Sequence, residues 1–179
     1  MIKVLVADDH PVVRRGIMQV LAEQPDIETV GEAENAAEVM RQISENSWDV
    51  LVLDISMPGR SGLDVLSEMK KIRPKLPVLI LSMHPEDQFG VRVLRAGAAG
   101  YLTKDTVSAE LVIAIRRVFS GKKYISVNLA DRIAADLEAG VEKPAHETLS
   151  DREFQVLQMI ANGKMIKEKI GRASGRERV

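Results

Sequence analysis

The sequence of 179 residues contains no cysteine, which excludes disulfides, thiolate metal sites and cysteine nucleophiles. Long apolar runs are missing too: VLVA, VLVL and LPVLIL have the length of strands and fall far short of the ~18 residues of a membrane span. No basic region followed by an apolar segment stands at the N-terminus. We therefore expect no signal peptide, no membrane partner and a cytoplasmic location.

An excess of charge of either sign is also absent, because 25 Lys and Arg residues face 26 Asp and Glu residues. The net charge of -1 excludes a wholly basic nucleic-acid coat. The charge is unevenly spread, however: residues 164–179 hold six basic and two acidic side chains, a net of +4, so residues 1–163 carry -5. With 45% apolar and 28% charged residues, the composition is that of a globular protein.

Short β-branched runs alternate with amphipathic stretches of helical length through about residue 120. The runs predict five strands, at 2–7, 27–33, 49–55, 77–83 and 99–103. The amphipathic stretches predict five helices, near 11–24, 35–46, 62–73, 86–96 and 106–120. The third and fourth strands are almost wholly apolar, as strands buried on both faces should be. This repetition predicts an α/β fold, a doubly wound parallel sheet with helices on both faces and right-handed crossovers.

The pattern changes after residue 121. Residues 127–139 predict one isolated amphipathic helix, and residues 140–148, with Gly, Pro and charge but no apolar periodicity, predict a linker. Ser150 and Glu153 then form an S-x-x-E capping box in front of apolar residues at helical spacing. A helix is therefore expected at 151–162, followed by a glycine that stops it.

Polar side chains stand where the predicted strands end. Asp8 and Asp9 follow the first strand, Asp54 ends the third, Ser82 ends the fourth and Lys104 follows the fifth. A single aspartate at such a place is more often a helix cap or a turn residue. Five coincident polar groups favour a shared pocket instead, because ligands of open parallel sheets bind beyond the carboxyl ends of the strands.

The residue types in that pocket indicate phosphoryl chemistry. Three crowded carboxylates repel one another unless a cation intervenes, and oxygen ligands without His or Cys suit Mg²⁺ before Zn²⁺. Asp54 can then serve as a nucleophile toward phosphorus, with Asp9 at the metal. Lys104 would neutralise charge on the transferred phosphoryl group, and Ser82 would donate a hydrogen bond to one of its oxygens.

Other side chains near the pocket have a plainer interpretation. Tyr101 lies inside the fifth strand, where core packing and a switching role are equally open. His10 and His84 border the pocket in loops, and we interpret both as surface residues. Three further aromatic residues are interpreted as packing residues: Trp48, Phe89 and Phe119.

The segments VLVADDH, DVLVLDISMPGRSG, LILSMH and GAAGYLTKD, in this order and spacing, resemble the receiver domain of two-component response regulators. The resemblance covers residues 1–121 and implies a flavodoxin-like five-stranded sheet of order 2-1-3-4-5. Seven residues take the family's roles by this resemblance: Asp54 as phospho-acceptor, Asp9, Asp54 and the main-chain carbonyl of Ser56 as Mg²⁺ ligands, Asp8 as a ligand through water, Ser82 and Tyr101 as the switch pair, and Lys104 as the phosphate-facing lysine.

DDHPVVRRGI and AGAAGYLTKD are similar to the NarL/LuxR (FixJ-like) branch, in which the proline that many receivers carry after the lysine is commonly missing; here that position is Asp105. In this branch a four-helix helix-turn-helix domain binds promoter DNA, and LSDREFQVLQMIANGK resembles its first helix. The remainder, MIKEKIGRASGRERV, resembles none of the other three. We therefore expect a receiver at 1–121, a linker at 122–148 and an incomplete output domain at 149–179 with an aberrant basic tail, which a truncation or frameshift would explain.

The resemblance implies a phosphorylation-gated switch whose partner is a cognate sensor histidine kinase. It also implies a receiver homodimer formed on phosphorylation and promoter DNA as a partner of full-length relatives, whereas the basic tail of this chain would touch DNA phosphates only nonspecifically. No enzymatic activity is expected beyond Mg²⁺-dependent self-phosphorylation and dephosphorylation at Asp54. The alternative is a stand-alone receiver that acts as a phosphoryl sink or as a protein-partner switch.

Two other classes fit the residues poorly. A phosphatase of the haloacid dehalogenase type needs a second aspartate two residues after its nucleophile, and position 56 is a serine. A flavodoxin-like mononucleotide binder needs a Gly/Ser/Thr-rich phosphate loop after the first strand. DDHPVV stands there instead, and its acids would repel phosphate.

Overall fold

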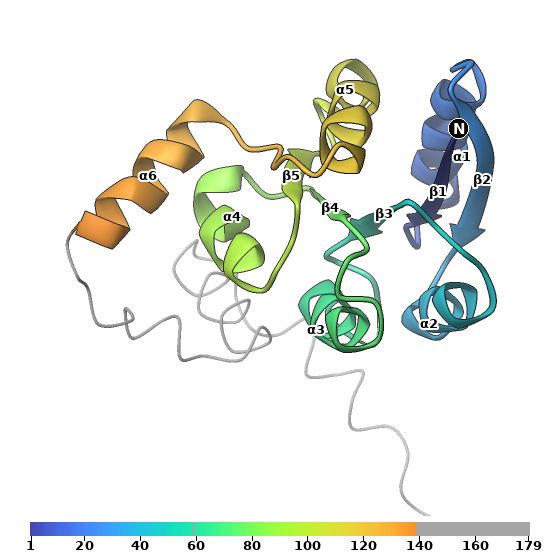
Figure 1. The fold of residues 1–179 in the computed structure, drawn as a ribbon, viewed down its shortest axis with the longest axis horizontal. Helices are drawn as coiled ribbons and strands as arrows, with labels where there is room; N and C mark the ends of the chain where they lie inside the picture. Colours follow the sequence, from blue (N-terminus) through green and yellow to red (C-terminus); the bar gives the residue numbers. More distant parts are fainter. Residues whose placement is uncertain (59, 139–179) are drawn as a thin grey trace, which may run out of the picture. The chain divides into compact units, whose positions relative to one another are not determined.

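The computed structural model describes residues 1–58 and 60–138 (Figure 1). In this part of the chain strands and helices alternate in the following order: β1 (Ile2–Ala7), α1 (Pro11–Ala22), β2 (Ile27–Ala33), α2 (Ala36–Glu45), β3 (Val50–Asp54), α3 (Gly62–Ile72), β4 (Val78–Ser82), α4 (Glu86–Arg95), β5 (Gly100–Thr103), α5 (Val107–Phe119) and α6 (Val127–Glu138). The linker predicted at 140–148, the helix predicted at 151–162 and its capping box of Ser150 and Glu153 lie outside the described residues.

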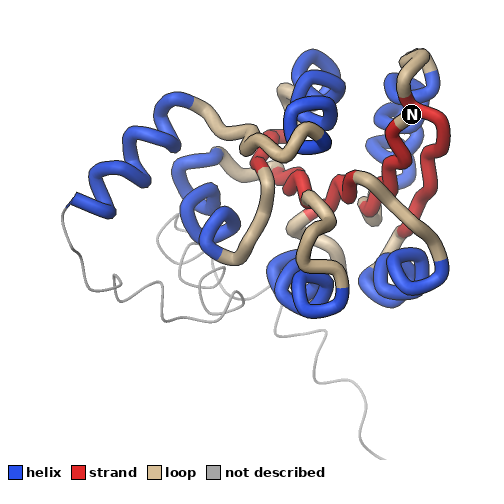
Figure 2. Tube along the Cα trace, viewed as in Figure 1, coloured by secondary structure: helices blue, strands red, loops and turns tan. Residues whose placement is uncertain are grey.

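The five strands form one parallel sheet of order β2-β1-β3-β4-β5, which confirms the predicted fold class. Helices α1 and α5 cover one face of the sheet, and α2, α3 and α4 cover the other (Figures 1 and 2). The chain leaves β1 toward β2 on one side, while β3 pairs with β1 on the other side. A crevice for a ligand is therefore expected at the carboxyl ends of β1 and β3.

Strands β3 and β4 are buried along their entire length. Because helices cover both faces, even their polar last residues, Asp54 and Ser82, are withdrawn from solvent. The sheet core around them is aliphatic, which is the composition that two covered faces require. The fold thus places a carboxylate and a hydroxyl in buried positions at one edge of the sheet.

The connection that follows Asp54 depends on a glycine. A Cβ atom added to Gly62 would lie 2.6 Å from the Cα atom of Ile55, too close for any real side chain. The Gly62 main-chain N–H donates to the carbonyl of Ile55 at 3.1 Å. Ser61 caps α3 by accepting a hydrogen bond from the main-chain N–H of Leu63. Together these contacts fold the loop tightly back over the end of β3.

The segment after α5 returns to the edge of the sheet. Tyr124 forms an isolated parallel bridge with Gly100, and its N–H donates to the carbonyl of Ala99 at 2.9 Å. Helix α6 then packs against α4. Its Leu129 is only 2% exposed, and a Cβ atom on Gly90 of α4 would lie 2.8 Å from the Leu129 side chain. Because Gly90 has no side chain, the side chain of Leu129 can lie against α4 at this position.

The three aromatic residues interpreted as packing residues differ in the structure. Phe89 is buried, and the Trp48 ring covers Gly31, where an added Cβ atom would collide with it. Phe119 is 49% exposed, so its interpretation as a packing residue is wrong. It is the last residue of α5. Among the described residues, no helix has the length and apolar character that crossing a membrane requires.

Candidate functional site

An acidic cluster lies at the carboxyl ends of β1 and β3. Asp8, Asp9, His10 and Asp54 each bring one ligand-type atom within 4.8 Å of the others. Asp8 and Asp54 are buried, whereas Asp9 and His10 face the solvent side of the cluster. The parallel arrangement of the strands brings these residues together from positions that are far apart in the sequence.

Lys104, which follows β5, joins two of the carboxylates. Its Nζ atom lies 2.7 Å from Oδ2 of Asp8 and 2.8 Å from Oδ2 of Asp54, and its side chain is only 6% exposed. Burial acts to lower the pKa of Lys104, but the hydrogen bonds and charges of Asp54 and Asp8 outweigh it and raise that pKa. One ammonium group thus neutralises part of the charge of two buried carboxylates.

The surroundings of Asp54 also shift the pKa of its carboxyl group. Burial raises its pKa and outweighs the hydrogen bonds from Lys104 and from the main-chain N–H of Ser56, which lower it. The Ser56 N–H donates to Oδ1 of Asp54 at 2.9 Å, while Oδ2 faces Lys104. Both oxygens of this carboxylate are therefore held in fixed directions.

The imidazole of His10 reaches into the cluster. Its Nδ1 atom lies 2.9 Å from Asp9 Oδ1, 3.1 Å from Asp8 Oδ1 and 4.0 Å from Asp54 Oδ2. Although the side chain is 59% exposed, as expected of a surface residue, its ring nitrogen faces all three carboxylates. A cationic or hydrogen-bonding group is therefore accommodated at the point on which the acids converge.

Arg14, which is not among the predicted site residues, supports the cluster from α1. It is buried, and its Nη1 atom donates to the main-chain carbonyl of Asp8 at 2.7 Å, while Nε donates to Oε2 of Glu32 at 2.9 Å. The available signal is its helical spacing, since Arg14 shares a face with the buried Ile17 and Leu21. It therefore fixes the turn that carries the acidic pair.

Ser82 and Tyr101 meet at a common residue. The Ser82 Oγ atom accepts a hydrogen bond from the main-chain N–H of His84 at 2.9 Å, and the Tyr101 hydroxyl donates to the His84 carbonyl at 2.8 Å. Both side chains are buried. The main-chain N–H of Lys104 donates to the carbonyl of Ser82 at 2.9 Å, which ties the end of β4 to the lysine.

The donor set fits a hard divalent cation. Within the cluster three carboxylates face a common point, and carboxylate oxygens are the ligands that Mg²⁺ prefers. The predicted site residues Asp8, Asp9, Asp54 and Lys104 thus meet in one cluster. Ser56 contacts the same cluster through its main-chain N–H, which donates to Asp54.

Comparison with known proteins agrees with this geometry. Residues 4–116 match the response regulator receiver domain. Response regulator GacA of Pseudomonas syringae pv. syringae (strain B728a) is 41% identical over 161 residues, which are 89% of this chain and 75% of that protein. Response regulator UvrY of Escherichia coli (strain K12) is 36% identical over 169 residues, 94% of this chain and 78% of that protein.

Solved structures give the same result. A two-component response regulator of the LuxR family from Aurantimonas sp. SI85-9A1 has a TM-score of 0.69 at 32% identity, over 76% of this chain and 97% of that chain. The isolated receiver domain of RcsB from Salmonella enterica serovar Typhimurium, in the presence of the phosphomimetic BeF3-, has a TM-score of 0.66 at 27% identity, over 73% of this chain and 96% of that chain. The resemblance noted in the sequence is therefore confirmed, and this chain belongs to the response regulator receiver domain family, with relatives of the NarL/LuxR type.

Proposed function

We propose that this chain is a phosphorylation-gated switch in which Asp54 accepts a phosphoryl group from a sensor histidine kinase. The observation that carries the proposal is the position of Lys104, whose ammonium group lies within 2.8 Å of both Asp54 and Asp8 inside a cluster of three carboxylates. A fixed cation beside a buried carboxylate is the arrangement that stabilises charge on a transferred phosphoryl group.

Mg²⁺ is the proposed cofactor. Asp9, Asp54 and the main-chain carbonyl of Ser56 would hold the ion, with Asp8 contributing through a water molecule. When bound, the ion neutralises the carboxylates and the phosphoryl oxygens, so that one anion can approach another. The His10 ring nitrogen contacts the same carboxylate oxygens of Asp8 and Asp9, so it would share them with the ion.

The acceptor step uses the chain's own side chains. An oxygen of the Asp54 carboxylate forms the new bond to phosphorus while the bond between phosphorus and the donor breaks. Lys104 orients the carboxylate before the reaction and then pairs with a phosphoryl oxygen. The Ser82 hydroxyl can donate to another phosphoryl oxygen, since its hydrogen bond with His84 uses the oxygen only as an acceptor.

The signal passes through the end of β4 and through β5. The phosphoryl group adds about -1.5 to -2 of charge and draws Ser82 and Lys104 toward it. Tyr101, which is linked to the same loop through His84, moves into the space that Ser82 leaves. The surface of α4, β5 and α5 then shifts between two pre-existing populations. Because α6 rests on α4, its position changes with them.

The proposed domain organisation is a receiver at 1–121, a linker at 122–148 and a segment at 149–179 whose sequence resembles the start of a helix-turn-helix output domain. In full-length relatives such a domain would control transcription through promoter DNA. A receiver homodimer on phosphorylation is the proposed intermediate between the two events.

The proposal is tested with Asp54→Asn. Incubated with a small phosphodonor and Mg²⁺, the wild-type chain is expected to gain the mass of one phosphoryl group, and the variant is expected to gain none. Asp64→Asn, which changes an exposed carboxylate in the first turn of α3, is the matched control and should be phosphorylated like the wild type. A phosphoryl gain by Asp54→Asn would show that another residue is the acceptor.

A further inference from the structure

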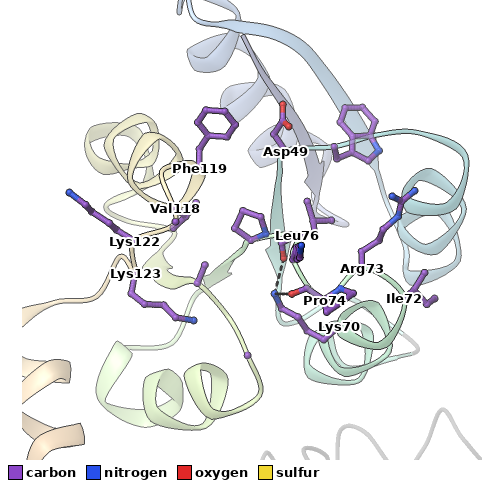
Figure 3. A pocket seen from close by; sticks show the side chains of 16 residues that line it. Asp49, Lys70, Ile72, Arg73, Pro74, Leu76, Val118, Phe119, Lys122 and Lys123 are labelled. Atoms are coloured by element: carbon purple, nitrogen blue, oxygen red, sulfur yellow. Dashed lines mark hydrogen bonds between the residues drawn. The ribbon is translucent and has the colours of Figure 1, made fainter.

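A groove of about 660 Å³ lies at the edge of the sheet opposite to Asp54 (Figure 3). It is formed by the end of α3, the loop that leads to β4, the end of α5 and the turn after α5. We call it the lysine groove, after its charged lining residues: Asp49, Lys70, Arg73, Lys75, Lys122 and Lys123. The volume is of the size that accommodates several side chains rather than a single ion.

The lining carries five cations against one carboxylate. That carboxylate is already engaged, since Oδ2 of Asp49 accepts a hydrogen bond from the main-chain N–H of Lys3 at 2.8 Å. Within residues 1–58 and 60–138, none of the five cations forms an ion pair. The groove therefore presents concentrated positive charge that the described part of the chain does not neutralise.

Two of the cations are held in place and converge. Lys70 Nζ donates to the main-chain carbonyls of Leu76 at 2.7 Å and Pro74 at 3.4 Å, and Lys123 Nζ donates to the carbonyl of Ala98. The two side chains point toward one another across the groove (Figure 3). Burial, and then the charge of Lys123, lower the pKa of Lys70. Folding thus brings two like charges together, and an anion between them would relieve their repulsion.

The lining of the groove also includes two exposed hydrophobic side chains. Phe119 is 49% exposed and Ile72 is 51% exposed, although both are large hydrophobic residues. A ligand that matches this surface carries negative charge and apolar groups together. A nucleic-acid backbone matches it less well, because its phosphates follow one another along a line, whereas Lys70 and Lys123 converge on a hollow (Figure 3).

We propose that the lysine groove binds an acidic segment of a partner protein, with carboxylates against Lys70 and Lys123 and an apolar side chain against Phe119. The site is separate from the phosphorylation site, since it lies at the other end of the strands. It provides the receiver with a second binding surface whose occupation does not require Asp54.

The test uses the full chain and a fluorescein-labelled peptide of alternating Glu and Leu, followed by fluorescence anisotropy. The peptide is expected to bind at low salt and to bind about tenfold more weakly to the double variant Lys70→Gln, Lys123→Gln, because two charge-assisted contacts are lost. Lys71→Gln with Arg41→Gln removes the same charge from exposed positions outside the groove and is expected to bind like the wild type.

Three results would overturn the proposal: no binding to the wild type, an equal loss in both double variants, or displacement of the peptide by a DNA duplex that binds the groove more tightly. Lys70 also holds the loop at residues 74–76, so the glutamine variant can lose structure as well as charge. Amide NMR spectra of the wild type provide the second measurement. Peptide-induced shifts at residues 70–77 and 118–123 support the groove, and shifts confined to other residues contradict it.

Discussion

At the scale of single residues, Asp8 is held from two directions. Lys104 contacts its carboxylate at 2.7 Å, and Arg14 donates to its main-chain carbonyl, also at 2.7 Å. Asp8 can therefore neither turn toward solvent nor withdraw from Asp9, its neighbour in the acidic cluster. Arg14 is a positioning residue in this arrangement, because it touches the turn rather than the reacting atoms.

Replacing Arg14 by methionine is expected to lower the affinity for Mg²⁺ about tenfold, as the loss of partners that orient metal ligands typically does. Calorimetric titration with Mg²⁺ measures this without any phosphorylation. Glu32→Gln is the control, since it weakens only the ion pair of Arg14 and leaves the bond to the Asp8 carbonyl intact. If Arg14→Met unfolds at a lower temperature but binds Mg²⁺ like the wild type, Arg14 has only a structural role.

The sequence predicts the acidic cluster because the ends of apolar strands can be recognised in it. The apolar run of β3 ends at Asp54, and the acids Asp8 and Asp9 directly follow the apolar run of β1. The sequence does not predict Arg14, because an arginine on a helix is usually exposed and only its phase with Ile17 indicates burial. The contact between the His10 ring and the acids depends on a rotamer, which periodicity does not encode.

At the scale of elements, the predicted strands and helices agree with the structure within one or two residues, since each has one dominant period. For example, the strand predicted at 77–83 is β4, Val78–Ser82, and the helix predicted at 127–139 is α6, Val127–Glu138. The sequence does not predict equally well how these elements pack against one another. Nothing in the sequence indicates that Leu129 fills a space left by Gly90, because that contact joins two helices across a distance of almost forty residues.

Leu129→Ala is expected to release α6 from α4 without unfolding the sheet. The loss of a buried leucine costs about 2–3 kcal/mol, and α6 makes few other contacts, so the effect remains local. Hydrogen exchange in residues 127–138 should accelerate about thirtyfold or more, while the Tm stays nearly unchanged. Val127→Ala, at an exposed position in the same helix, should change neither. A large fall in Tm with unchanged local exchange would mean that α6 belongs to the cooperative core.

The ion pair between Asp26 and Arg116 links the start of β2 to α5 and predicts a pH dependence. Arg116 donates to both Asp26 oxygens, at 2.8 and 2.7 Å, and these hydrogen bonds lower the pKa of Asp26 although burial acts to raise it. A carboxyl group whose pKa is lower in the folded state stabilises that state above its unfolded pKa of about 3.9, and this contribution disappears as the pH falls through the folded pKa.

Asp26→Asn is therefore expected to lower the Tm at neutral pH, by a few degrees at most because the pair is exposed. Thermal unfolding of both proteins over a pH series should show the difference shrinking as the pH falls below the unfolded pKa. High salt should shrink it as well. A difference that stays constant down to acid pH would assign the effect to packing rather than to charge.

At the scale of the whole molecule, the net charge is unevenly distributed along the chain, and this bears on DNA binding. Residues 1–163 carry -5 and residues 164–179 carry +4, so the chain as a whole is nearly neutral while its parts are not. A duplex with its dense phosphates would be repelled by the acidic receiver and attracted by the basic tail. Contacts of this kind release counterions but read no bases.

Any DNA binding by this chain is therefore expected to be independent of sequence and strongly weakened by salt. With about four phosphates neutralised, raising the salt concentration from ~50 to ~200 mM should lower the affinity about a hundredfold. Anisotropy titrations with two unrelated duplexes of equal length, at both salt concentrations and with and without phosphodonor, measure this. A preference for one duplex that persists at high salt would contradict this prediction. Such a preference requires direct contacts to the bases, and those contacts are less sensitive to salt than contacts to phosphates. Such a preference appearing only after phosphorylation would instead indicate an output domain that recognises its promoter under the control of Asp54.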